Sequence, residues 1–411
     1  MMLINVLQKL FYFIILFVEI LNYSNLYSAS RFGNMVKRSP LYALQKNLGA
    51  KFTEFAGFEM PIQYSSIKDE HLIVRRKVGL FDVSHMSNVW ITGDDAEELI
   101  SLTTVEDASR IDDKKSQYTA ILRENGTVID DTIFMHLDDK YMIIPNAGMD
   151  KIVTDWLNKT AEQHNIHSKA ENVSDKYVIL AIQGPKSREI LQKLTDVDLK
   201  NVGFFDCQYI DIAGINCIIS HTGYTGELGF ELQISPTNLA EKVFNKILEA
   251  GNGFGIKPIG LGARDTLRLE KGFILAGNEF AGGRTPLEAT MSWTINWDHD
   301  FIGKKALIKQ KEKGDFERLT CLICIDKGIP RNGCEIQKDG KKVGMVTSGS
   351  LSPCLNAGIA MGYCHPNYRE KDLVLDIMIR NKPVKARVVK PPMVPKDWAQ
   401  QNKILTGKLF I

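Results

Sequence analysis

The sequence predicts an α+β protein whose C-terminal part is a separate all-β domain. Up to Gly303-Lys304, patterns typical of helices and of strands mix irregularly along the chain. From Glu317 to Lys390 the pattern is short strand and turn, with turn signals at Asp339-Gly340 and Asn381-Lys382-Pro383. Such a run is typical of a small barrel or sandwich. A chain of 411 residues has room for two or three domains with buried cores.

The elements of the N-terminal half follow from caps, alternating apolar residues and turn residues. Ser39-Pro40 begins a first helix and Gly49 ends it, because proline suits the first helical turn and glycine the end. Asn125-Gly126 is typical of a hairpin turn between two strands. In chain order we expect helices at about 66–77 and 94–102, and strands at 89–91, 116–122, 128–135, 141–144 and 177–182.

The same signals continue to the end of the mixed region. Gly184-Pro185 and Ser235-Pro236 each begin a helix, and the second helix ends before Gly251. A helix with Arg264 near its start runs to about residue 270, and a last helix runs from 304 to about 313. Strands are expected at 215–220 and 229–234.

Composition narrows the class of protein. Apolar residues make up 44% and charged residues 24% of the chain, as in an ordinary globular protein. A net charge of +2 gives no electrostatic case for binding nucleic acid. The seven scattered cysteines indicate a reducing compartment rather than a disulfide framework. Cys321 and Cys324 have C-x-x-C spacing, but on a strand they face opposite sides, so we expect packed thiols.

The first 38 residues have the character of a targeting leader. An apolar stretch from Phe11 to Leu21, interrupted by Glu19, follows Lys9 and is too short for a membrane span. Its charge pattern differs from that of an Arg-rich mitochondrial presequence without acidic residues. Met35 offers an alternative start. We therefore expect residues 1–38 to be a leader, and the mature protein to have no stable membrane span.

A glycine-rich run at 221–231 is the most informative motif, together with the later segment 260–265. Three glycines surround Tyr224, and Glu231 follows on a predicted strand. Glycines let a backbone approach a flat ligand closely or adopt positive φ. A carboxylate beside them can accept two parallel N–H bonds from a planar heterocycle. The run therefore indicates a pocket for a pterin-like ring. Alternatively, Glu231 faces solvent and Arg264 belongs to a helical ladder of ion pairs.

Asp130-Asp131 lies within a predicted apolar strand, so its two side chains point to opposite faces. One carboxylate can face a cavity while the other meets solvent or a cap. Such a group can orient an amine or stabilise a cationic nitrogen, unless it only bonds backbone amides at a turn. Tyr118 and Tyr224 could stack on a planar ligand or be buried with satisfied hydroxyls.

Other kinds of chemistry lack their motifs. His85 and His221 have no partners at metal-ligand spacing, so we expect no metal. We find no P-loop, no G-x-S-x-G and no dinucleotide fingerprint after a strand. We therefore expect chemistry based on carboxylates and an organic cofactor.

In their order along the chain, these motifs resemble those of the glycine cleavage T-protein family, whose members are aminomethyltransferases. The resemblance covers nearly everything after residue 38. The matching segments are 40–42, 55–61, 74–86, 129–131, 183–186, 221–231, 260–270, 285–288 and 347–349.

The resemblance implies a three-domain, cloverleaf-like architecture with tetrahydrofolate at its centre and an all-β C-terminal domain. It places a folate-binding core of two interleaved α+β domains at 39–315 and a β-barrel with its tail at 316–411. It implies transfer of the aminomethyl carbon from the lipoyl arm of the H protein to tetrahydrofolate, giving 5,10-methylene-tetrahydrofolate, ammonia and dihydrolipoyl H protein. It also implies a role in glycine catabolism, a mitochondrial location and a monomer or weak dimer.

Residue roles carried over from the resemblance fall into three groups. Asp131 is the catalytic carboxylate, which orients the folate amine and stabilises the iminium-like carbon as ammonia leaves. Glu231 and Arg264 contact the folate, and Tyr118 and Tyr224 line its ring. The less decisive pocket positions are Asn146, Met86 and Trp398.

The chain departs from the family pattern at three places near these motifs. His221 stands where arginine is usual, Leu228 replaces a common aspartate, and Ser87 replaces a glycine. His221 makes a fixed positive charge conditional on pH near neutrality. These departures concern folate affinity more than the type of reaction.

Two alternative functions keep the fold. One is a folate-binding iron–sulphur assembly factor, but residues 271–279 lack the cysteine that such proteins carry. The other is a folate-dependent demethylase with a different donor, because few pocket residues decide the donor.

Overall fold

The computed structural model describes residues 36–396 together with 398 and 399. Most of the predicted leader therefore lies outside the described residues. Lys37–Arg38, at the end of the predicted leader, forms a short strand, β1, which pairs in parallel with β3 (Phe58–Gln63). Among the described residues, no helix combines the length and the apolar character that crossing a bilayer requires.

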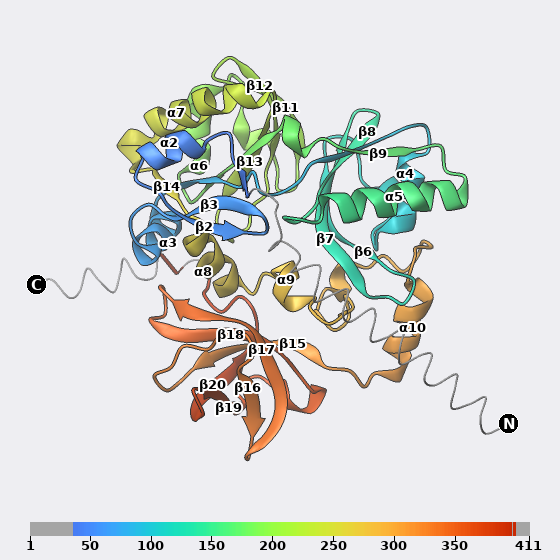
Figure 1. Cartoon of the computed structure of the whole chain (residues 1–411), viewed down its shortest axis with the longest axis vertical. Coiled ribbons are helices and arrows are strands. Elements are labelled where there is room, and N and C mark those ends of the chain that lie inside the picture. Colours follow the sequence, from blue (N-terminus) through green and yellow to red (C-terminus); the bar gives the residue numbers. More distant parts are fainter. Residues whose placement is uncertain (1–35, 397, 400–411) are drawn as a thin grey trace, which may run out of the picture.

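A six-stranded sheet forms the first part of the molecule, at the upper left of Figure 1. Its central strand, β10 (Val178–Gln183), is buried along its whole length and pairs antiparallel with β13 (Gly229–Ile234) and β4 (Gly79–Asp82). In sheet order the strands are β11 (Cys207–Ile212), β12 (Ile215–Ser220), β13 (Gly229–Ile234), β10 (Val178–Gln183), β4 (Gly79–Asp82) and β14 (Lys257–Ile259).

Helices cover both faces of this sheet because each presents an apolar stripe to it. On one face, α2 (Tyr42–Asn47), α6 (Ser187–Leu191) and α7 (Ala240–Gly251) close the largest apolar core. On the other face, α3 (Ile67–Arg76) and α8 (Leu261–Lys271) contribute buried apolar residues to a second core. The Ser66 hydroxyl caps α3 by accepting a bond from the Asp69 amide.

A five-stranded antiparallel sheet forms the second part, at the right of Figure 1. The helices α4 (Ala96–Thr103) and α5 (Asp150–His164) pack on it through a shared apolar core. The predicted hairpin around Asn125-Gly126 is confirmed, with Gly126 at φ +81°. In sheet order the strands are β6 (Ser116–Leu122), β7 (Val128–Leu137), β8 (Lys140–Ile144), β5 (Val89–Thr92) and β9 (Lys169–Asn172).

The C-terminal part is a closed six-stranded barrel, which confirms the predicted all-β domain (Figure 1). Cys321 packs between the barrel and α8, whereas Cys324 lies in the barrel interior, so both thiols are buried on different sides as expected. Around the barrel the strands are β15 (Arg318–Cys324), β18 (Ala357–Cys364), β17 (Lys341–Ser352), β16 (Glu335–Lys338), β19 (Val374–Ile379) and β20 (Lys382–Val389).

Two smaller features connect these parts. The strand β2 (Lys51–Phe55) pairs with β3, and Gly260 lets α8 begin against β3, because a Cβ there would lie 2.4 Å from the Ile62 backbone. The segment between α8 and the barrel contains two short helices, α9 (Ala276–Glu279) and α10 (Lys304–Lys313).

A buried ion pair joins α3, α8 and the barrel. The Glu270 carboxylate accepts bonds from Arg75 Nη2 at 2.9 Å and from Ser352 Oγ at 2.5 Å, and His71 Nε2 lies 3.0 Å away. Arg75 also donates to the Thr225 carbonyl at 2.5 Å. Burial lowers the pKa of His71, so its ring is neutral at neutral pH and Arg75 is the cation that balances Glu270.

We predict that Arg75→Ala lowers the free energy of unfolding by roughly 3–5 kcal/mol, because it leaves the Glu270 charge buried without its cation. Urea unfolding measures the change. The control is Lys151→Ala, which breaks the exposed Lys151–Asp155 pair and should change stability by less than about 0.5 kcal/mol. Equal effects of the two substitutions would contradict a structural role for the buried pair.

Candidate active site

The acidic pair lies on β7, and the loop after β8 holds both of its members. Asp130 and Asp131 are 0% and 8% exposed. The Asn146 amide nitrogen Nδ2 lies 2.8 Å from Asp130 Oδ1 and 3.0 Å from Asp131 Oδ1, and the Asn146 backbone N–H donates to Asp130 Oδ2. Asn146 therefore bonds Asp130 through its backbone and its side chain, and it also contacts Asp131.

Tyr118 gives Asp131 its second side-chain partner. Its hydroxyl donates to Asp131 Oδ2 at 2.7 Å, across the β6–β7 hairpin. The Tyr118 ring stacks on Trp293, with centroids 5.9 Å apart, and Trp293 is 69% exposed. The site therefore reaches the surface at an exposed indole. Sequence reasoning missed Trp293, because a lone tryptophan in a short turn gives no signal of its neighbours.

Burial changes the protonation of the pair. Burial raises the pKa of Asp131 to about 6, although hydrogen bonds from Tyr118 and Asn146 favour the ionised form. Burial and the neighbouring Asp131 charge raise the pKa of Asp130 well above its usual value. At neutral pH, Asp131 therefore carries a negative charge. Asp131 is thus a buried anion poised near its own pKa, as acid–base chemistry requires.

Glu231 lies on β13 of the first sheet and points away from the core that holds Phe230 and Leu232, as predicted. Its Oε2 accepts a 2.5 Å bond from the Thr222 hydroxyl. The Ser220 and Thr222 hydroxyls lie 2.7 Å apart. A chain of hydroxyls thus orients a half-buried carboxylate at the end of the glycine-rich run.

The structure corrects the role of two glycines in this run. Gly223 and Gly229 do not leave room for a ligand but for the Gln183 side chain, because a Cβ at either position would lie within 2.3 Å of the Gln183 amide. Gln183 Nε2 donates to the Thr222 carbonyl and so holds the glycine-rich run in position. Gly226 does adopt positive φ, at +72°.

Arg264 and Tyr224 form a stacked pair beside Glu231. The Arg264 guanidinium carbon lies 4.6 Å from the Tyr224 ring centroid, a cation–π contact, and the Tyr224 hydroxyl donates to the Ile274 carbonyl. Burial lowers the pKa of Arg264, and the Glu231 charge opposes that shift. The ladder of ion pairs considered for Arg264 belongs instead to Arg268, which pairs with Asp265 and Glu279.

The two halves of the site lie within electrostatic reach of each other. Burial raises the pKa of Tyr224, and the charge of Asp131 adds to this shift while that of Arg264 opposes it. Tyr224 is thus within electrostatic reach of both the Asp131 carboxylate of the second sheet and the Arg264 cation of α8. The structure brings together Asp131, Asn146 and Tyr118 on one side and Glu231, Arg264 and Tyr224 on the other.

The remaining predicted residues lie at different places. Met86, on the connection between β4 and β5, packs against the apolar core that includes Ala263, next to Arg264. The Arg76 guanidinium carbon lies over the Trp398 ring, 5.5 Å from the ring centroid. The nearby Lys271 binds the Val394 carbonyl and is about 10 Å further along α8 than Arg264. A role of Trp398 in folate binding stays a prediction from the resemblance.

The three departures from the family pattern all have structural partners. His221 Nδ1 lies 3.0 Å from the Val202 carbonyl, and its ring stacks on Phe230. Burial lowers the pKa of His221, so this position is neutral rather than conditionally charged at neutral pH. Ser87 N–H donates to the Pro145 carbonyl, and the Leu228 carbonyl accepts from the Gly184 amide.

One cluster of described residues has the spacing of metal ligands. His71, Glu270 and Cys354 present ligand atoms within 4.8 Å of one another. Glu270, however, is already neutralised by Arg75 at 2.9 Å, so we assign the cluster to the structural ion pair.

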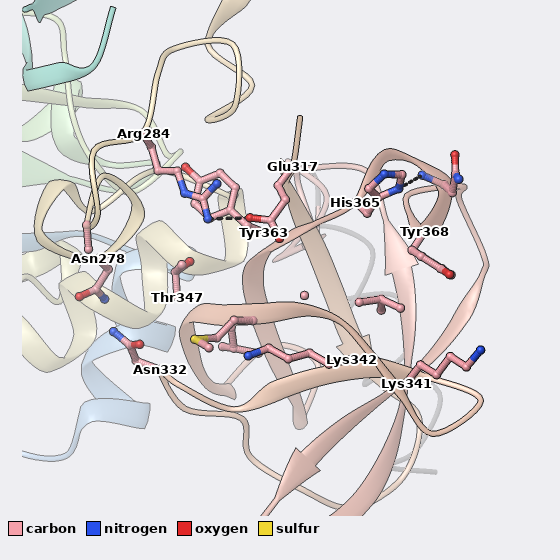
Figure 2. A pocket seen from close by; sticks show the side chains of 16 residues that line it. Asn278, Arg284, Glu317, Asn332, Lys341, Lys342, Thr347, Tyr363, His365 and Tyr368 are labelled. Carbon is pink, nitrogen blue, oxygen red and sulfur yellow. Dashed lines mark hydrogen bonds and ion pairs between the residues drawn. The ribbon is translucent and has the colours of Figure 1, made fainter. Parts of the chain in front are cut away.

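A cavity of about 750 Å³ lies elsewhere, between the outer face of the barrel and the segment around α9 (Figure 2). None of the predicted site residues lines it. Its lining includes Lys341, Lys342 and Arg284, and its carboxylate Glu317 is paired with Arg284 at 2.8 Å. This cavity offers no unpaired buried carboxylate, so we place the candidate active site at Asp131 and Glu231.

Comparisons with known proteins identify the family of the chain. Residues 41–299 match the GCVT N-terminal domain, and residues 317–395 match the glycine cleavage T-protein C-terminal barrel domain. An aminomethyltransferase of Caldanaerobacter subterraneus is 43% identical over 366 residues, covering 88% of this chain and 97% of the relative. An aminomethyltransferase of Thermosipho melanesiensis is 42% identical, covering 87% and 97%.

Solved structures give the same result. The crystal structure of the glycine cleavage system aminomethyltransferase T from Bartonella henselae superposes with a TM-score of 0.81. It is 30% identical in sequence, and the match covers 87% of this chain and 98% of that one. The chain belongs to the glycine cleavage T-protein family.

Proposed function

We propose that this protein transfers the aminomethyl carbon from the lipoyl arm of the glycine cleavage H protein to tetrahydrofolate. The products are 5,10-methylene-tetrahydrofolate, ammonia and dihydrolipoyl H protein. The observation that carries the proposal is the buried Asp131 carboxylate, held by Tyr118 and Asn146 within electrostatic reach of Tyr224, whose ring contacts Arg264. Relatives named aminomethyltransferase support it over nearly their whole length.

The reaction exchanges two bonds at one carbon. The bonds from that carbon to the amine nitrogen and to the lipoyl sulphur break, and two bonds to folate nitrogens form. The two folate N–H protons move to the departing ammonia and to the sulphur. The carbon passes through a cationic, iminium-like state, which a buried carboxylate stabilises. Asp131 also orients the attacking amine, because Tyr118 and Asn146 fix its position.

The second half of the site suits the pterin ring. A reduced pterin presents parallel N–H donors along one planar edge, which the Glu231 carboxylate can accept together. Thr222 holds Glu231 in place through Oε2. Tyr224 supplies an aromatic surface, and Arg264 supplies a donor for a ring oxygen.

The donor, the partner and the compartment are parts of this proposal. No structural feature described above favours the demethylase, and the assay below separates it by its donor. The H protein follows from the family relationship. The relatives above lend no support to a mitochondrial location, which stays a prediction from resemblance.

We predict that Asp131→Asn slows transfer by on the order of 10²–10⁴-fold while tetrahydrofolate still binds, because the substitution removes the charge that stabilises the transition state. The assay uses aminomethyl-loaded H protein and tetrahydrofolate, and it measures ammonia release. The control is Asp139→Asn, in an exposed turn. Equal rates for wild type and Asp131→Asn would remove Asp131 from the mechanism. Turnover only with a methylated sulphur donor would favour the demethylase.

We also predict how the transfer rate in this assay depends on pH. Because the pKa of Asp131 is raised to about 6, its carboxylate form is complete above that pH and is lost as the pH falls through it. We expect the wild-type rate to fall about tenfold per pH unit below pH 6. The residual rate of Asp131→Asn should not show this fall. A wild-type rate that stays constant between pH 5 and about pH 7 would contradict the assignment.

We predict that Glu231→Gln weakens tetrahydrofolate binding by about 10–100-fold with a smaller effect on the rate at saturation, because it removes a charge-assisted acceptor that serves binding. Calorimetric titration with tetrahydrofolate measures the affinity. Glu249→Gln, on the surface of α7, is the control and should bind like wild type. Unchanged affinity of Glu231→Gln would mean that the pterin lies elsewhere.

A further inference from the structure

We propose that His85 is a further ligand-binding residue of this site, whose imidazole hydrogen-bonds the reduced pterin ring held between Glu231 and Asp131. The proposal deepens the proposed function and rests on it. It starts from a buried ring nitrogen that has no partner in the protein.

His85 lies where the chain passes from one sheet to the other. The strand β4 ends at Asp82 in the first sheet, and β5 begins at Val89 in the second. The connection is fixed at both ends: Asp82 accepts bonds from the Ser84 amide and hydroxyl, and the Ser87 amide donates to the Pro145 carbonyl. Pro145 directly precedes Asn146, which holds the acidic pair. The connection therefore runs between the two halves of the candidate site.

The His85 ring is buried without a hydrogen bond at Nδ1. The residue is 3% exposed, and within the described residues no partner lies within bonding distance of Nδ1. A buried polar atom left in this state destabilises the folded protein, and native proteins leave few of them. The other buried histidines of the described chain do have partners: His71 contacts Thr266, and His221 contacts the Val202 carbonyl.

The surroundings of His85 fit a neutral heterocycle. Its ring meets Phe55 edge-on, with centroids 5.5 Å apart. Burial, with a contribution from the Arg264 charge, lowers the pKa of His85 to about 3, so the ring is neutral at working pH. A neutral imidazole offers one donor and one acceptor. It can bond a ring N–H or carbonyl without adding a second positive charge beside Arg264.

The test measures the affinity for tetrahydrofolate and the urea midpoint of unfolding. Loss of a ligand-binding residue should lower the affinity but not the midpoint, whereas loss of a packing residue should lower the midpoint. His85→Phe keeps an aromatic ring but removes both nitrogens. We expect tetrahydrofolate to bind about tenfold more weakly, because one hydrogen bond to the ligand is lost. We expect the urea midpoint of the free protein to stay equal or rise, because the unpaired nitrogen is gone. His85→Asn keeps a polar atom near the Nδ1 position and should recover part of the affinity.

The matched control is His136→Phe. His136 Nδ1 lies 2.8 Å from the Ile111 carbonyl, so this substitution should lower the urea midpoint and leave the affinity for tetrahydrofolate unchanged. Wild-type affinity in His85→Phe would overturn the proposal. If His85→Phe binds more weakly and also loses stability like His136→Phe, the measurement on the wild-type protein described next decides between the two roles.

A measurement on the wild-type protein covers the case in which His85→Phe does not fold. The imidazole nitrogen resonances of ¹⁵N-histidine-labelled protein are assigned to His85 with the His85→Asn variant. Addition of tetrahydrofolate should shift a His85 nitrogen resonance, and an unchanged His85 resonance on saturation with tetrahydrofolate would overturn the proposal. Failure of the wild-type protein to bind tetrahydrofolate at all would contradict the proposed function itself. Weak or normal binding by the His85 variants bears only on the role of His85.

Discussion

The buried pair between Arg75 and Glu270 is the constraint on which the rest of this structure depends. Glu270 lies near the end of α8 and also binds Ser352 of the barrel, so one carboxylate sets the position of both. Since a helix is rigid over three turns, fixing Glu270 also fixes Arg264 at the other end of α8. Arg75 in turn binds the Thr225 carbonyl in the glycine-rich run that leads to Glu231. The pair therefore positions three segments that are far apart in the sequence.

The candidate site is built where two sheets meet. Glu231 belongs to the first sheet and Asp131 to the second, and neither sheet supplies both. Each carboxylate is oriented by hydroxyl or amide donors of its own sheet: Thr222 for Glu231, and Tyr118 with Asn146 for Asp131. This arrangement separates binding from chemistry, because the two carboxylates have different environments. The buried Asp131 has a raised pKa, and this property suits acid–base work.

Much of the fold could be predicted from local signals, because those signals act over a few residues. The cap at Ser66, the turn at Asn125-Gly126 and the turn at Asp339-Gly340 each mark an element that the structure contains. The helix α5 was not predicted, although Val153, Leu157 and Ala161 repeat every four residues and lie buried on one face. The short edge strand β11 was also missed, because six residues of mixed polarity give a weak pattern.

The site could be predicted only in part, since its geometry depends on contacts between distant residues. The glycine run pointed to Glu231 and Arg264, but Gly223 and Gly229 accommodate Gln183, a partner some 40 residues away that spacing cannot reveal. The contacts of Asn146 with both aspartates and the stacking of Trp293 on Tyr118 are likewise products of tertiary structure. Trp398 was predicted from its position near the C-terminus, and its contact with Arg76 is likewise a product of tertiary structure.

The most direct test of the central claim is a crystal structure of the protein with tetrahydrofolate bound. The account predicts that the pterin edge lies within hydrogen-bonding distance of Glu231 and that the carbon-accepting nitrogens face Asp131. Density for the folate in the cavity of Figure 2, with no contact between the folate and Glu231 or Asp131, would contradict this account.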